Sequence, residues 1–176
     1  MSKILISGYY GFANAGDEAM LTAIIESLRQ VEKNVELTVL SGNPEDTAAK
    51  HQVCSVYRFN PLGIIRAMKD SELIISGGGS LLQDVTSKRS LLYYLSIIGL
   101  GKFFGKKVML FAQGIGPIRA KWARKLTSLV CNEADLITVR DSESAAELIE
   151  MGVKPEKITV TADSVLSLNP VTKECG

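Results

Sequence analysis

The chain has 176 residues, which is enough for one α/β domain with a buried core and too few for two ordinary ones. Hydrophobic residues make up 46% and charged residues 22%, a globular composition that excludes a disordered protein. The formal net charge is only +1, so no nucleic-acid partner is expected.

Cysteine and histidine usage bounds the chemistry further. The three cysteines, Cys54, Cys131 and Cys175, are scattered and form no CxxC pair, which favours a reducing compartment. The one histidine, His51, has no cysteine or aspartate partner at metal-ligand spacing. We therefore expect a cytoplasmic protein without a metal site.

Membrane contact depends on one apolar segment. The N-terminus, MSKILISGYYG, has too short an apolar run for a signal peptide. The segment 91–104 is shorter than the ~20 residues that a membrane-spanning helix needs. It is either a buried core helix or a helix lying on a membrane surface, so peripheral contact with the inner face of the membrane stays open.

Apolar runs typical of strands alternate with segments of helical periodicity along the chain. This order predicts right-handed crossovers and a Rossmann-like α/β fold, with a mostly parallel sheet and helices on both faces. The predicted strands are 3–7, 35–40, 53–57, 73–76, 107–112, 136–139 and 158–161, and the predicted helices are 17–31, 61–68, 90–104, 121–133 and 142–151.

Glycine and polar residues follow the ends of five predicted strands. In parallel sheets ligands bind beyond the carboxyl ends of the strands, so these loops are expected to converge on one site. The loops are GYYGFANAGDEA, GGGSLLQD, QGIGP, RDSES and ADS.

The first loop combines aromatic rings with carboxylates. Its glycine spacing matches neither a dinucleotide fingerprint nor a P-loop. Tyr10 and Phe12 are rings on which a sugar can stack, and Asp17 and Glu18 suit a ligand rich in hydroxyl groups. The alternative is a purely structural turn.

The second and third loops offer backbone and amide groups. Gly77, Gly78 and Gly79, followed by Ser80, form either a nest of amides for an anion or a close packing contact. Gln83 and Asp84 are candidate partners of sugar hydroxyls. The QGIGP loop places Gln113 at the same edge and is otherwise a structural turn.

The last two loops supply a cation and a carboxylate. Arg140 follows a buried strand, where its forked guanidinium suits a carboxylate or phosphate, unless it only forms a salt bridge with Asp17, Glu18 or Asp163. Asp163 is expected either to face the pocket or to cap a helix. The chain shows no Ser/His/Asp or Cys/His nucleophile set, which suggests that a partner domain completes the site.

Taken in order, the segments GYYGFANAGDEA, SGGGSLLQDVTS, QGIGP, TVRDSES and TADSV resemble the polysaccharide pyruvyl transferases. The likeness is greatest to the bacterial enzymes that pyruvylate a cell-wall polymer used to anchor S-layer proteins. It covers essentially the whole chain, and the ordered set is specific although each motif is weak. One departure is Ala13, because the family's first loop usually reads GFGN and here reads GFAN.

The resemblance implies a two-domain architecture. Family members resemble GT-B glycosyltransferases, which have two Rossmann-like domains. We therefore expect residues 1–168 to form the N-terminal, acceptor-side domain and 169–176 to be a linker or truncated end, with the second domain absent from this chain.

The resemblance also implies a reaction. Phosphoenolpyruvate donates its three-carbon unit to two hydroxyls of one sugar, which gives a cyclic ketal and releases phosphate, without a further cofactor. Arg140 and Asp17 are the expected catalytic residues, and the general acid is expected on the second domain. The residues expected to bind the acceptor, which could be lipid-linked, are Tyr10, Phe12, Asn14 and Glu18.

Two other functions remain open from the sequence. One is a GT-B glycosyltransferase that uses a nucleotide sugar, and the other is a carbohydrate-binding module without enzymatic activity.

Overall fold

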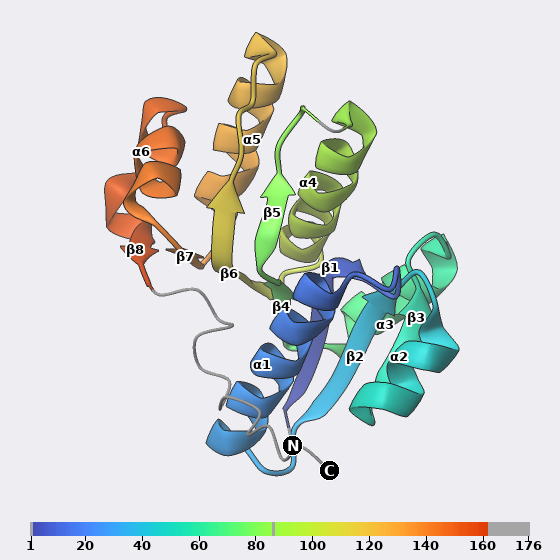
Figure 1. The fold of residues 1–176 in the computed structure, drawn as a ribbon. Helices are drawn as coiled ribbons and strands as arrows, with labels where there is room; N and C mark the ends of the chain where they lie inside the picture. Colours follow the sequence, from blue (N-terminus) through green and yellow to red (C-terminus); the bar gives the residue numbers. More distant parts are fainter. Residues whose placement is uncertain (1, 86, 162–176) are drawn as a thin grey trace, which may run out of the picture.

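The computed structural model describes residues 2–85 and 87–161, and they form an α/β fold around one parallel sheet (Figure 1). Its eight strands run in the order β3-β2-β1-β4-β6-β7-β8, with β5 paired to β6, and every pairing is parallel. The strands are β1 (Lys3–Tyr10), β2 (Glu36–Ser41), β3 (Cys54–Tyr57), β4 (Leu73–Ser76), β5 (Gly79–Leu82), β6 (Lys107–Ile115), β7 (Leu136–Val139) and β8 (Ile158–Val160).

Helices cover both faces of the sheet, as predicted. The helices are α1 (Ala15–Val31), α2 (Pro44–His51), α3 (Pro61–Asp70), α4 (Lys88–Phe103), α5 (Lys121–Glu133) and α6 (Ser142–Glu150), with a 3₁₀ turn η1 (Pro155–Lys157). Successive side chains of a strand point to opposite faces, and β1 shows this directly. Ile4 and Ile6 pack with α1, whereas Leu5 packs in a second core with residues of α3, α4, α5 and α6.

The segment predicted as a core helix, 90–104, is α4. Leu91, Leu95 and Ile98 are buried against the sheet, whereas Leu92 and Phe103 are exposed. Within the described segments, no helix has both the length and the apolar character needed to cross a bilayer.

The parallel pairing brings the ends of β1, β4, β6 and β7 to one edge of the sheet, as expected. This edge therefore carries the first loop, the glycine loop, the QGIGP loop and Arg140. The loop with Asp163, the expected boundary at 168 and the segment 169–176 lie outside the described residues.

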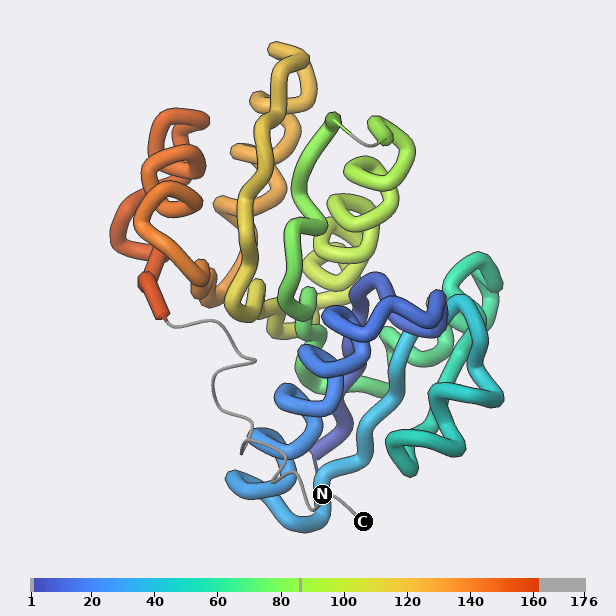
Figure 2. The backbone as a smooth tube through the Cα atoms, in the orientation of Figure 1, coloured from blue at the N-terminus to red at the C-terminus, as the bar shows by residue number. Residues whose placement is uncertain are grey.

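One predicted loop is a strand. The segment that begins with Gly77-Gly78-Gly79 was expected to be a loop, serving either as an amide nest or as a close packing contact. Gly79 instead begins β5, which runs beside the extended end of β6 (Figure 2). The Gly77 amide donates to the Ser7 carbonyl at 2.8 Å, so it is not available to a ligand. In this structure Gly77 is therefore committed to the backbone, and Gly79 passes close to Asp17 at the wall of the site.

Candidate active site

The first loop is held by its own polar side chains. The Asn14 carboxamide oxygen caps α1 by accepting from the amides of Gly16 and Asp17, at 3.0 and 3.3 Å. Glu18 accepts from the Gly11 amide at 2.9 Å and contacts His51 Nε2 at 3.1 Å. Asn14 and Glu18, both predicted to bind the acceptor, thus fix the loop in this structure.

The aromatic pair on this loop is not the predicted one. Phe12 stacks on Tyr9, with ring centroids 4.3 Å apart and 13° between the planes, and both rings are about two-fifths exposed. Tyr10 is fully buried at the end of β1, so it offers no face to a ligand. The prediction for Tyr10 is therefore wrong because the alternation of the strand turns Tyr9 outward and Tyr10 into the core.

Ala13 occupies a backbone conformation that favours glycine. Its φ is 56°, in the left-handed region, where a Cβ costs roughly 1 kcal/mol. We predict that Ala13→Gly raises the free energy of unfolding by about 1 kcal/mol, because it relieves this strain. Urea denaturation of the two proteins measures the difference, and a less stable variant would contradict the assignment.

A cavity of about 270 Å³ lies beside the first loop and β5. It is lined by three of the residues predicted to belong to the site, namely Asp17 from the first loop and Ser80 and Gln83 from the second. Its remaining lining residues are Tyr9, Leu81, Ser90 and Tyr94, which the sequence did not single out. The cavity thus combines aromatic faces with a carboxylate, hydroxyls and an amide, the groups that bind a sugar.

Asp17 is the acidic group of this cavity. Partial burial, followed by the nearby charge of Glu18, raises the pKa of the Asp17 carboxyl above its ordinary value. Gly79, with φ 90°, passes so close that a Cβ there would lie 3.2 Å from Asp17 Oδ1. The glycine backbone thus leaves room for a carboxylate that is suited to accept a proton from a bound hydroxyl.

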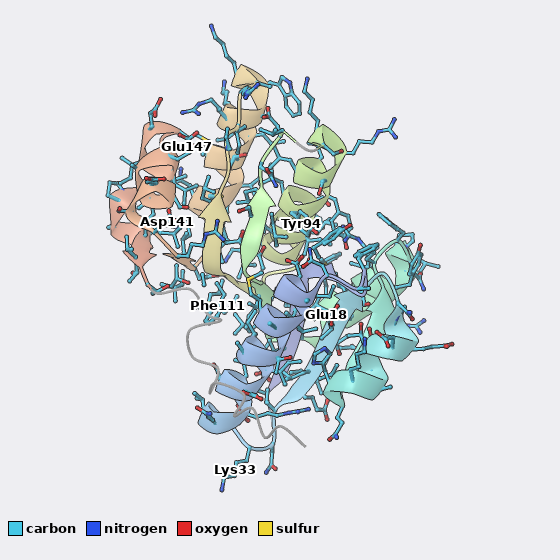
Figure 3. The ribbon with its side chains drawn as sticks, viewed as in Figure 1. Glu18, Lys33, Tyr94, Phe111, Asp141 and Glu147 are labelled. Carbon is cyan, nitrogen blue, oxygen red and sulfur yellow. The ribbon has the colours of Figure 1, made fainter. Side chains whose placement is uncertain are left out.

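Arg140 lies next to the cavity and contacts one of its walls. Its Nη2 donates to Ser80 Oγ at 3.2 Å, and its Nε donates to Asp141 Oδ2 at 3.3 Å. The guanidinium packs over Gly114, where a Cβ would lie 2.7 Å from Arg140 Cζ. Figure 3 shows the labelled Tyr94, which lines the cavity, and Asp141, the partner of Arg140, on opposite sides of β5 and β6.

Two more predicted residues serve the backbone in this structure. Asp84 accepts from the amides of Ala120 and Arg119, and these hydrogen bonds lower the pKa of its carboxyl. Gln113 is fully buried and donates through Nε2 to the carbonyls of Ser76 and Gly77, at 3.1 and 2.7 Å. Both residues position the loops around the cavity and do not line it.

Sequence reasoning missed Arg58, which follows β3. Only 4% of this residue is exposed, and five aromatic rings lie within 6 Å of its Cζ atom, those of Tyr9, Phe12, Phe59, Tyr93 and Tyr94. The signal available in the sequence was an arginine between Tyr57 and Phe59.

Residues 2–85 and 87–161 contain no group of three or more His, Cys, Asp or Glu side chains arranged to hold a metal ion.

Comparison with known proteins adds a family and a fold. A family model described as "Polysaccharide pyruvyl transferase" matches residues 14–174. No curated protein matches the sequence.

Several solved structures share the fold. HepE from Anabaena in complex with UDP-glucose is 14% identical with a TM-score of 0.61, over 93% of this chain and 44% of that one. UDP-GlcNAc 2-epimerase from Neisseria meningitidis bound to UDP-GlcNAc is 13% identical with a TM-score of 0.57, over 94% and 47%. The lipopolysaccharide outer core galactosyltransferase WaaB is 15% identical with a TM-score of 0.52, over 92% and 45%.

These likenesses concern the fold alone, which is that of one half of a GT-B glycosyltransferase or epimerase. The chain spans less than half of the length of each of these three structures.

Proposed function

Because the chain belongs to the polysaccharide pyruvyl transferase family, we propose that it is the acceptor-side half of an enzyme that uses phosphoenolpyruvate to pyruvylate a sugar. In this reaction two hydroxyls of one sugar add to the ketal carbon, a cyclic ketal forms and phosphate leaves. The acceptor belongs to a cell-wall polysaccharide of the kind that anchors S-layer proteins. The donor is a substrate, and no further cofactor is proposed.

One observation carries the proposal: a sugar-sized cavity with a carboxylate lies beside an arginine, at the edge of the sheet where the family motifs meet. Attack by the sugar hydroxyls requires a group that accepts their protons, and Asp17 is the carboxylate of the cavity. Positive charge develops at the ketal carbon, so the anionic groups of the donor must be held nearby. Arg140, on the other side of Ser80, is the cation proposed for them.

The proposal assigns the remaining functions to a second domain. Protonation of the donor's methylene carbon requires a general acid, and we place it on that domain, which would close over the cavity. We further propose a cytoplasmic enzyme whose acceptor is lipid-linked, working at the inner face of the membrane. The exposed Leu92 and Phe103 of α4 are the apolar side chains offered for that contact.

Phosphate release from phosphoenolpyruvate tests the reaction. We expect release by a protein that carries both domains, only with a sugar acceptor such as an N-acetylmannosamine-containing saccharide, and none by this chain alone. Release that does not depend on the acceptor would count against the proposal. Absence of release together with binding of a nucleotide sugar would favour the glycosyltransferase, and saccharide binding without turnover would favour a binding module.

Phe12 offers a separate test of acceptor binding. We predict that Phe12→Ala weakens acceptor binding by about 1–3 kcal/mol, because the exposed ring of the Tyr9–Phe12 pair no longer stacks on the sugar. The acceptor KM of the two-domain protein should rise. Leu129→Ala, which truncates an exposed apolar side chain on α5, is the control, and an unchanged acceptor KM for Phe12→Ala would exclude stacking.

A further inference from the structure

Arg58 is a buried cation in aromatic surroundings. Its Nε and Nη1 atoms are buried and make no hydrogen bond of good geometry within the described part of the chain. No ion pair there includes Arg58. The rings attract the cation, with the Tyr93 centroid 4.4 Å from Cζ, but a ring face accepts no in-plane N–H. A buried charge is costly unless it is paired, so this arrangement calls for an anion.

Two phenols, those of Tyr93 and Tyr94, lie beside the Arg58 guanidinium and interact with it. The hydroxyls of Tyr93 and Tyr94 are buried and make no hydrogen bond of acceptable geometry among the described residues. Burial raises the pKa of Tyr93 to about 12, although the nearby guanidinium acts in the opposite direction, so the phenol keeps its proton. Each phenol is therefore a hydrogen-bond donor next to a cation.

We propose that Arg58, Tyr93 and Tyr94 form a binding site for the phosphate group of an organic phosphate. Nε carries one N–H and Nη1 carries two, so with the two phenol O–H groups the site offers five donors. A carboxylate has about four lone-pair positions for them, whereas a phosphate presents three non-bridging oxygens. Phosphate also gains most from the planar, forked donor set of arginine.

The position of this site connects it to the cavity with Asp17. Tyr9 and Tyr94 contribute rings around Arg58 and also line that cavity. On the other side, Arg58 lines an apolar groove between α3 and α4, together with Phe59, Ile64 and Tyr93. Phe12 and Phe59 lie near the guanidinium and are exposed, so a ligand reaches Arg58 by displacing ring side chains and not the backbone.

The phosphate could belong to the donor or to a phosphorylated saccharide, and calorimetric titration of this chain distinguishes the two. Phosphoenolpyruvate and glucose 1-phosphate are titrated, with pyruvate and glucose as matched ligands that lack the phosphate. We expect at least one phosphate ester to bind, and we expect Arg58→Met to raise its dissociation constant about tenfold or more. Arg66→Met, which removes an exposed cation on α3, is the control and should not change the dissociation constant.

The assignment makes a second, structural expectation. Since Arg58 is a buried cation that forms no ion pair with residues 2–85 and 87–161, Arg58→Met should melt at the same temperature as the parent chain or higher. Only the parent should gain thermal stability from the phosphate ester. Tyr93→Phe keeps the aromatic ring and removes only the hydroxyl, and it should weaken binding of the phosphate ester. If Arg58→Met does not fold, Arg58→Lys takes its place in the comparison with the parent chain.

Three results overturn the proposal: no phosphate ester binds, binding is the same in Arg58→Met, or pyruvate alone depends on Arg58. If binding of phosphoenolpyruvate depends on Arg58, the site belongs to the donor. If binding of glucose 1-phosphate depends on Arg58, the site belongs to a saccharide phosphate. Because only binding is measured, the site can be present whether or not the chain takes part in pyruvyl transfer.

Discussion

Arg140→Ala is expected to reduce kcat for pyruvyl transfer by a factor on the order of 10²–10³, the usual effect of removing one donor that stabilises charge in a transition state. Arg140 contacts Ser80 and Asp141 and lies over Gly114, so its guanidinium has a defined place beside the cavity. Phosphate release by the protein with both domains measures the effect. Binding of a simple saccharide to the chain should stay nearly the same.

Two further variants separate position from charge. In Gly114→Ala the new Cβ would lie 2.7 Å from Arg140 Cζ and Nε, so it must displace the guanidinium while keeping its charge. We expect a loss of turnover that approaches that of Arg140→Ala. Arg119→Ala removes an exposed cation near the same edge of the sheet and should leave turnover intact. Full turnover by Arg140→Ala would make this residue a purely structural contact of Ser80 and Asp141.

The sequence predicted most strands and helices in their order along the chain, because burial leaves a strong periodic signal in the sequence. Two elements escaped for physical reasons. Thr47 is the only buried residue of α2, all of whose residues are described, so this helix has almost no apolar face to detect. Asn43 and Pro44 nevertheless mark its start. β5 begins with a glycine and is a strand because β6 continues to Ile115 and pairs with it. That pairing is a tertiary contact, which local sequence does not encode.

The sequence predicted site residues correctly where their position at the edge of the sheet was enough to place them in the cavity. It failed where the direction in which the side chain points decided whether the residue faces the cavity. Asp17, Ser80 and Gln83 meet in one cavity because parallel strands deliver their loops to the same edge. The prediction for Tyr10 failed because neighbouring side chains of a strand point to opposite faces of the sheet, so Tyr9 is exposed and Tyr10 is buried. Asn14 and Asp84 satisfy exposed amides of nearby helices and loops, a local use that the same motifs permit.

Asp17→Asn is expected to lower turnover by about 10²–10⁴, because the amide cannot accept a proton from the attacking sugar hydroxyl. The exposed Glu26→Gln on the same helix is the matched control and should keep full turnover. The raised pKa of Asp17 places its ionisation above the ordinary aspartate value, so the acid limb of the pH–rate profile should lie correspondingly higher. An acid limb that is unchanged in Asp17→Asn would remove this residue from the proposed chemistry.

The same carboxyl has a predictable effect on stability, opposite in sign to its effect on activity. Because the pKa of Asp17 is raised in the folded protein, the folded state holds the proton more tightly than the unfolded chain, and stability falls as the pH rises through the folded pKa. At neutral pH the ionised carboxylate is therefore a net cost, and Asp17→Asn should unfold at a higher urea concentration than the parent. The difference should shrink as the pH approaches the ordinary value of 3.8, where both states become protonated. A variant that loses turnover and gains stability only at neutral pH would mark Asp17 as a group kept for its chemistry, whereas a loss of both would make it a structural carboxylate.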